Sequence, residues 1–229
     1  METGNRSQSS TSSVFVTGNP TTDRFVIFLD IMGFKDRVAR QDHQQILRDL
    51  QNLSNFISEK LLREEGFIFT MFSDSIIILS SDVEYKTFEK LVDLTNAVIA
   101  YSISLNLPIK GAFARGKCTA ISGGKSLYFG QPIIDAYALE ENVELYNVVL
   151  HHTVEDYAIQ LSAETGKVFD YQVKLKGGIS RHFVLSWFNP TIDENKNNLI
   201  EIRKTVSDYP RRYIDNTLRC IEKYEEQLH

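Results

Sequence analysis

The stretch Phe25-Val-Ile-Phe-Leu-Asp30, followed by Ile31-Met32-Gly33-Phe34, decides how the rest of the chain is interpreted. Five bulky apolar residues in a row are typical of a strand that is buried on both faces. A carboxylate at the end of such a strand is costly to bury without a partner, so Asp30 needs a compensating group. The end of this strand is therefore a candidate site.

A second segment supplies a partner for Asp30. The apolar runs Phe67-Ile-Phe-Thr-Met-Phe72 and Ser75-Ile-Ile-Ile-Leu79 are separated only by Ser73-Asp74, which predicts a tight hairpin with Asp74 at its tip. If the hairpin pairs beside the first strand, the two carboxylates face each other. Because Mg²⁺ and Mn²⁺ prefer oxygen ligands, we expect them to hold metal. Taken singly, each aspartate is better explained as a turn-capping residue.

The composition fits one soluble globular domain with attachments. The chain has 229 residues, of which 42% are hydrophobic and 24% charged, and its net charge is −5. This charge argues against broad nucleic-acid binding, although a small anionic ligand needs only a few local cations. No apolar run approaches the length of a membrane span, and no signal peptide is recognised, so we expect no membrane association and a cytoplasmic location.

Three parts of the chain are predicted. Residues 1–22 are mostly small and polar and are expected to form a disordered arm. Residues 23–188 alternate between strand and helix patterns, beginning with strand, helix, hairpin, helix and strand, and are expected to form the main domain. Residues 189–229 are charged, with a helical pattern and Pro210 as a break, and are expected to form a C-terminal helical extension.

The order of these motifs resembles the catalytic domain of class III nucleotidyl cyclases. Phe28-Leu-Asp-Ile-Met-Gly-Phe34 is similar to the first metal motif of that family, and Phe72-Ser-Asp74 is similar to the second. Tyr128-Phe-Gly130 resembles the segment that opens the helix with nucleotide contacts. Val173-Lys-Leu-Lys176-Gly177 resembles the late hairpin whose lysine binds the triphosphate. The resemblance implies an α+β fold with a ferredoxin-like βαββαβ core, in which helices pack on an antiparallel-rich sheet.

Family resemblance also implies roles for particular residues. Asp30, Asp74 and the carbonyl of Ile31 would be the metal ligands for two divalent cations, Mn²⁺ or Mg²⁺. Lys176 would bind the substrate phosphates, although a solvated hairpin lysine is an equal alternative. The family forms its sites between two such domains, with the metal aspartates on one and the Lys176-type residue on the other, which implies a homodimer with composite active sites.

The departures from the family concern the choice of base. The residues with which adenylyl cyclases of this family read purine fall at Thr70 and Leu127, and neither side chain supplies that pattern of donors and acceptors. The usual asparagine and arginine of the following helix fall at Ile134 and Ala138. This combination is similar to the pyrimidine cyclases of bacterial anti-phage (Pycsar) signalling.

The resemblance therefore implies conversion of UTP to 3',5'-cyclic UMP and pyrophosphate, with the product acting on a cyclic-nucleotide-responsive effector. The sequence does not choose between UTP and CTP. A degenerate cyclase fold that serves as a nucleotide-binding or sensing module is the competing hypothesis.

Two further groups are candidates for binding phosphate. The backbone amides of Met32, Gly33 and Phe34 lie at a glycine turn that opens a helix, where they would hold the β- and γ-phosphates. Arg115 lies in an otherwise apolar strand. It is a candidate for the catalytic cation that the family's arginine, replaced here by Ala138, would otherwise supply. A structural ion pair is the alternative explanation for this arginine.

Overall fold

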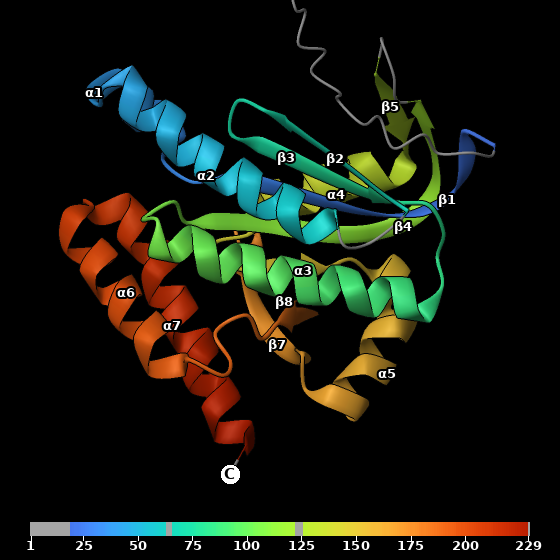
Figure 1. Ribbon diagram of the computed structural model, residues 1–229. Coiled ribbons are helices and arrows are strands. Elements are labelled where there is room, and N and C mark those ends of the chain that lie inside the picture. The colour runs from blue at the N-terminus through green and yellow to red at the C-terminus, as the bar shows by residue number, and fades with distance from the viewer. Residues whose placement is uncertain (1–18, 63–65, 122–125, 229) are drawn as a thin grey trace, which may run out of the picture.

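The structure is a computed structural model that describes residues 19–62, 66–121 and 126–228. Strands and helices alternate along most of the chain, as Figure 1 shows. In chain order the elements are β1 (Thr21–Ile31), α1 (Phe34–Arg40), α2 (His43–Leu61), β2 (Phe67–Phe72), β3 (Ser75–Ser80), α3 (Tyr85–Ser104), β4 (Ile109–Ile121), β5 (Leu127–Gly130), α4 (Gln131–Asn142), β6 (Val148–Leu150), the 3₁₀ turn η1 (His152–Val154), α5 (Glu155–Thr165), β7 (Val168–Leu175), β8 (Gly178–Leu185), α6 (Ile192–Thr205) and α7 (Asp208–Leu228).

The strands form one eight-stranded sheet in the order β2-β3-β1-β4-β6-β8-β7, with β5 paired to β4 outside this path. β1 is antiparallel to both of its neighbours, β3 and β4, and β2 and β3 form the predicted hairpin. β4 and β6 run parallel. The first four strands with the helices between them make the βαββαβ core, so the predicted α+β, antiparallel-rich fold is confirmed.

Side chains of β1 alternate between two faces of the sheet that are covered differently. Phe25 packs against Phe88 of α3 and Tyr157 of α5, with ring centroids 5.6 and 5.1 Å apart. Phe28 points the other way and meets Tyr137 of α4 at 5.4 Å. We call the face that carries Phe25, covered by α3 and α5, the helical face, and the face that carries Phe28, covered by α4, the α4 face. In Figure 1, α2 and α3 lie in front of the sheet and α4 lies behind it.

The chain after Asn189 forms two helices that pack on the domain. Figure 1 shows α6 and α7 side by side at one end of the molecule. Thr217 Oγ1 of α7 accepts a hydrogen bond from the amide of Tyr146 at 2.8 Å, and Asn216 donates to the carbonyl of Glu144 at 2.7 Å. The helical stretch is interrupted at Val206 and Ser207, close to the predicted break at Pro210, which itself lies in the first turn of α7, where a missing N–H costs little.

At the N-terminus, residues 1–18 of the predicted arm lie outside the described part of the chain. Thr21 and Thr22 already belong to β1, and Thr21 Oγ1 lies 2.7 Å from Thr119 Oγ1 of β4. β1 therefore begins two residues before residue 23, the predicted start of the domain. Among the helices described, none combines the length and apolar character that crossing a membrane requires.

Candidate active site

Two aspartates meet at one end of the sheet. Asp30 is the penultimate residue of β1, and Asp74 lies in the turn between β2 and β3. The amide of Ile31 donates to the carbonyl of Asp74 at 3.0 Å, which ties the end of β1 to the turn. Ser73 adopts a left-handed φ of 57°, the conformation that a two-residue hairpin turn requires. The structure thus brings the two predicted carboxylates together.

Strand register shows which side chains share the α4 face with Asp30. Residues directly opposite each other in antiparallel strands point to the same side of the sheet. Lys110 of β4 is opposite Asp30. Thr70 is opposite Ile77, which is in turn opposite Phe28, two residues before Asp30. Thr70 therefore lies on the same face as the carboxylate, as the prediction of a substrate-binding role requires.

The surroundings of Asp30 disfavour its charged form. Burial raises the pKa of Asp30 from its ordinary 3.8 to about 7, and the carboxylates of Glu140 and Asp74 act in the same direction, while the ammonium of Lys110 acts against them. Negative charge at this point is therefore not fully compensated by the chain itself. A bound cation would stabilise the ionised carboxylate.

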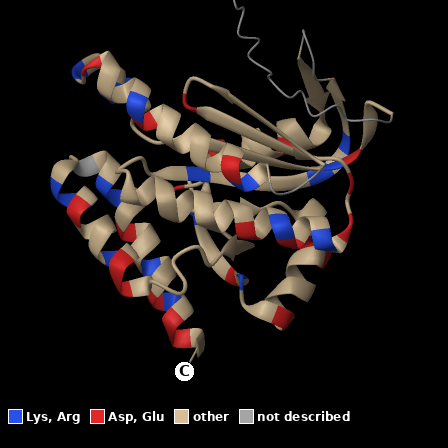
Figure 2. Cartoon of the chain, viewed as in Figure 1, with Lys and Arg blue, Asp and Glu red and all other residues tan. Residues whose placement is uncertain are grey.

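A buried ion pair lies beside Asp30 that sequence reasoning missed. Lys110 Nζ is 2.9 Å from Glu140 Oε1 and 2.7 Å from the carbonyl oxygen of Glu140, on α4. The two side chains are only 6% and 4% exposed. Burial raises the pKa of Glu140, and the neighbouring ammonium partly offsets this rise. The feature of the sequence that could have indicated this pair is a lysine within the apolar strand β4. Figure 2 shows how few charged residues the strands carry compared with the helices.

The donor set at the two aspartates fits Mg²⁺ or Mn²⁺ bound together with a substrate. Two carboxylates supply oxygen ligands, and these ions usually keep water and substrate oxygens as the others. In the described residues, no group of three or more His, Cys, Asp and Glu side chains is arranged to hold a metal. Asp30, Asp74 and the carbonyl of Ile31 stay the candidate protein ligands, and the uncompensated charge at Asp30 supports this assignment.

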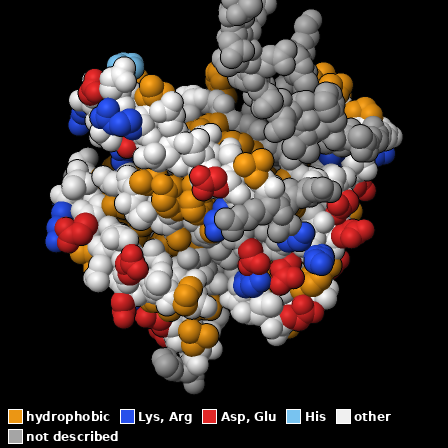
Figure 3. All heavy atoms as spheres, in the orientation of Figure 1, with side chains coloured by type: hydrophobic (Ala, Val, Ile, Leu, Met, Phe, Trp, Pro, Cys, Tyr) orange, Lys and Arg blue, Asp and Glu red, His pale blue; other side chains and the backbone are white. Residues whose placement is uncertain are grey.

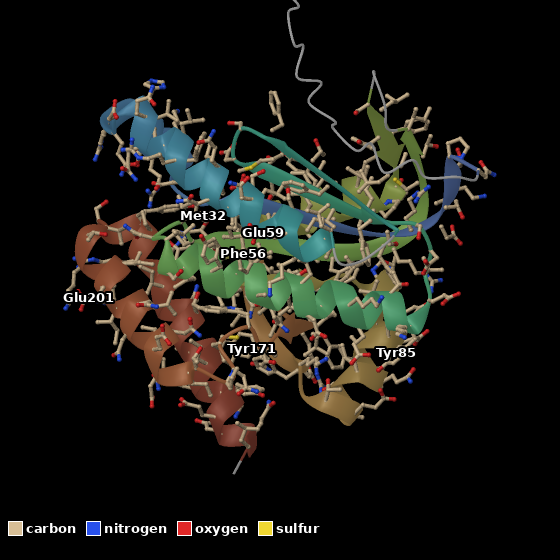
Figure 4. All side chains as sticks on the ribbon, viewed as in Figure 1. Met32, Phe56, Glu59, Tyr85, Tyr171 and Glu201 are labelled. Atoms are coloured by element: carbon tan, nitrogen blue, oxygen red, sulfur yellow. The ribbon has the colours of Figure 1, made fainter. Side chains whose placement is uncertain are left out.

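The turn after β1 differs from the prediction in one respect. Gly33 adopts a left-handed φ of 74° and precedes α1, so a glycine turn opening a helix is present. However, the amide of Met32 donates to the carbonyl of Pro108 at 2.8 Å and is not available for phosphate. In Figure 4, Met32 lies left of the centre of the view and Tyr85, which begins α3, lies at the right. Only the amides of Gly33 and Phe34 remain as candidates.

Lys176 lies in the turn between β7 and β8, as predicted. Its amide donates to the carbonyl of Asn142 at 2.8 Å, so the turn is attached to the end of α4. The side chain is exposed, and its charge lowers the pKa of Glu140 slightly against the larger effect of burial. An open pocket of about 260 Å³ adjoins the turn, lined by Asn142, Leu175 and residues 177–180.

Arg115 does not lie beside Asp30 and Asp74 in the same chain, and its contacts there support the structural alternative to the predicted catalytic role. Its partner across the strands is Phe25, on the helical face, whereas Asp30 lies on the α4 face. Its guanidinium donates to Tyr157 Oη at 3.0 Å and lies 5.4 Å from the centre of that ring. Alternation along β4 thus directs Arg115 away from Asp30. It stabilises the contact between β4 and α5.

Leu127 is also remote from Asp30 within one chain. It pairs with Ile121 at the far end of β4, whereas Lys110, opposite Asp30, is near the beginning. At about 3.3 Å per residue, this separation is on the order of 30 Å. A substrate bound at Asp30 can reach a Leu127 side chain only if a second chain supplies it.

The elements around the site expose several large apolar side chains. Phe72 at the hairpin is 83% exposed, and Ile134 and Tyr137 of α4 are 59% and 46% exposed. Ala138 of the same helix is exposed as well. On the side shown in Figure 3, apolar side chains also gather between α2 and α3, where Phe56 stacks on Tyr101 at 4.2 Å.

Comparison with known proteins identifies the fold. No family model matches the sequence, and neither does any curated protein. The solved structure of the adenylyl cyclase CyaB from P. aeruginosa is similar, with a TM-score of 0.56 at 20% identity, covering 72% of this chain and 95% of that one.

Two guanylyl cyclase structures are similar to the same extent. The guanylate cyclase domain of RhGC from Catenaria anguillulae, solved with GTP, gives a TM-score of 0.54 at 14% identity, covering 72% of this chain and 96% of that one. A dimeric guanylyl cyclase domain of non-standard arrangement from Blastocladiella emersonii gives 0.58 at 14% identity, covering 72% and 97%. This chain therefore has the fold of adenylyl and guanylyl cyclase catalytic domains.

Proposed function

We propose that the protein is a pyrimidine nucleotide cyclase that converts UTP to 3',5'-cyclic UMP and pyrophosphate. The observation that carries the proposal is the meeting of Asp30 and Asp74 on a cyclase fold, tied together through the Ile31 amide. In the reaction, the ribose 3'-hydroxyl attacks the α-phosphorus and pyrophosphate leaves. Two divalent ions would make that hydroxyl more acidic and neutralise charge on the leaving phosphates.

Different residues of the chain would bind the metal ions and the triphosphate. Asp30, Asp74 and the Ile31 carbonyl would hold the ions. The exposed ammonium of Lys176, beside an open pocket of about 260 Å³, would bind the triphosphate, and the amides of Gly33 and Phe34 would assist.

The proposed preference for pyrimidine rests on Thr70 and Leu127. A hydroxyl and an aliphatic side chain stand where purine-reading residues stand in adenylyl cyclases, and Thr70 shares the face of Asp30. CTP is the nearest alternative substrate, because uracil and cytosine differ by one carbonyl-to-amino exchange. Similarity to Pycsar enzymes suggests that the product is a second messenger of anti-phage defence, read by a separate effector.

A homodimer is part of the proposal. Leu127 and Asp30 lie too far apart in one chain to contact one nucleotide. The exposed Phe72, Ile134 and Tyr137 give the α4 side an apolar surface that a second copy would cover. In this arrangement each nucleotide would lie between the Asp30 cluster of one chain and the base-binding residues of its partner.

The test is to incubate the purified protein with each of the four ribonucleoside triphosphates and Mn²⁺ and to identify the products by mass spectrometry. We expect cyclic UMP from the wild type and none from Asp30→Ala. A purine cyclic nucleotide would overturn the role given to Thr70 and Leu127. Nucleotide binding without any cyclic product would favour the degenerate sensing module, for which the exposed Ile134 and Ala138 in place of asparagine and arginine are the supporting observation.

A further inference from the structure

Lys110 is placed to reach Asp30 but binds elsewhere. The two residues are directly opposite in the β1–β4 pair, with side chains on the same face. Opposite residues in antiparallel strands have Cβ atoms about 5 Å apart, so a lysine side chain can span the gap with ease. The ammonium instead contacts Glu140 twice, through Oε1 at 2.9 Å and through the backbone carbonyl at 2.7 Å.

An ammonium on Asp30 would compete with a divalent cation for the same oxygens. Lysine carries a compact charge on a flexible stem, which pairs readily with any carboxylate in reach. The charge of Lys110 already acts on Asp30 from its present position. Whether Asp30 is available as a ligand therefore depends on what holds Lys110 away from it.

We propose that Glu140 is a positioning residue that retains the Lys110 ammonium at α4 and so keeps Asp30 free to bind a divalent cation. This inference rests on the proposed function, because it concerns the same metal site. Of the two contacts, only the one to the carboxylate supplies a full negative charge. Loss of that charge leaves Asp30 as the strongest anionic partner of Lys110 among the groups identified around it.

The test is a double-mutant cycle on Mn²⁺ affinity, with Mn²⁺ alone as the probe. Free Mn²⁺ is measured by electron paramagnetic resonance for the wild type, Glu140→Gln, Lys110→Met and the double variant, each checked for folding by circular dichroism. Glu141→Gln is the matched control, since Glu141 is the adjacent residue of α4 and is exposed. Removing a group that orients a metal ligand typically lowers metal affinity by 10- to 100-fold.

We expect Glu140→Gln to weaken Mn²⁺ binding about tenfold in the wild-type background and less than twofold in the Lys110→Met background. Glu141→Gln should change it less than twofold. An equal loss in both backgrounds would mean that Glu140 acts only as a nearby negative charge, which would overturn the proposal. A purely structural role also predicts that the double variant binds no better than Glu140→Gln, so rescue separates the two explanations.

The design remains decisive if Glu140→Gln does not fold. Lys110→Met and the double variant then carry the test, because the proposal expects them to bind Mn²⁺ equally within twofold, and a larger difference would overturn it. Failure of the proposed function gives a different pattern. If Asp30→Asn binds Mn²⁺ as tightly as the wild type, the metal site itself is wrong, whatever the cycle shows.

Discussion

Replacing Asp30 by Asn is expected to make the metal-free protein more stable, even though it removes the proposed metal ligand. Burial and the neighbouring carboxylates raise the pKa of Asp30 to about 7, well above its ordinary 3.8. Between about pH 4 and 7 the folded state therefore holds a proton that the unfolded state has released. The free energy of unfolding falls as the pH rises through this window. Asparagine carries no charge and escapes this penalty.

The size of the effect follows from the two pKa values. One pKa unit corresponds to about 1.4 kcal/mol, so a difference of about 3 corresponds to about 4 kcal/mol for a group without solvent screening. Because the side chain is only partly buried, we halve this to about 2 kcal/mol at pH 8. At pH 5 most of the penalty is absent, and less than about 1 kcal/mol remains.

Thermal unfolding in EDTA, followed by circular dichroism between pH 5 and 8, measures this difference. About 2 kcal/mol should raise the Tm of Asp30→Asn above that of the wild type by about 4–8 °C at pH 8, and by less at pH 5. Asp23→Asn is the control, since Asp23 is an exposed aspartate of the same strand. A less stable Asp30→Asn protein at pH 8, or a difference that does not depend on pH, would refute the reasoning. Added Mn²⁺ should raise the Tm of the wild type alone.

Three further substitutions test other parts of the structure. Ile134→Asp places a charge on the exposed side of α4 and should weaken the dimer at least about 100-fold in sedimentation experiments, because desolvating an unpaired charge is costly; unchanged association would exclude α4 from the interface. Arg115→Met removes the contacts to Tyr157 and should lower the free energy of unfolding in urea by about 1–2 kcal/mol, while turnover per folded molecule changes less than threefold. A hundredfold loss of turnover would restore Arg115 to the site. Thr217→Val removes the acceptor for the Tyr146 amide and should cost about 1–3 kcal/mol in the same assay, whereas no loss would show that α7 contributes little to stability.

The sequence was sufficient for the fold and for the two aspartates, for a physical reason. The apolar runs around Asp30 and Asp74 are long and bounded by short turns, so strand positions and the hairpin follow from local pattern. Which strands pair, and in which register, depends on contacts between distant segments. For this reason the meeting of Asp30 and Asp74 was a hypothesis before the structure placed β3 beside β1.

Arg115 and Lys110 show what local pattern cannot supply. Both residues interrupt an apolar strand, and their spacing already places them on opposite faces. The sequence does not say which face belongs to Asp30, since that depends on the register of β4 against β1. The amide of Met32 is a similar case, because its partner, the Pro108 carbonyl, comes from a distant segment.

Because the two faces of the sheet are covered unequally, the rate of product formation would depend steeply on the concentration of the protein. The helical face is closed by the chain's own helices, whereas the α4 side leaves Phe72, Ile134 and Tyr137 exposed. A site completed across that surface works only in the dimer. Well below the dissociation constant, the dimer concentration grows with the square of the chain concentration, so doubling the protein would give about four times the rate of product formation. Such a chain would form very little product at low concentration, and the rate would rise steeply as the protein accumulates.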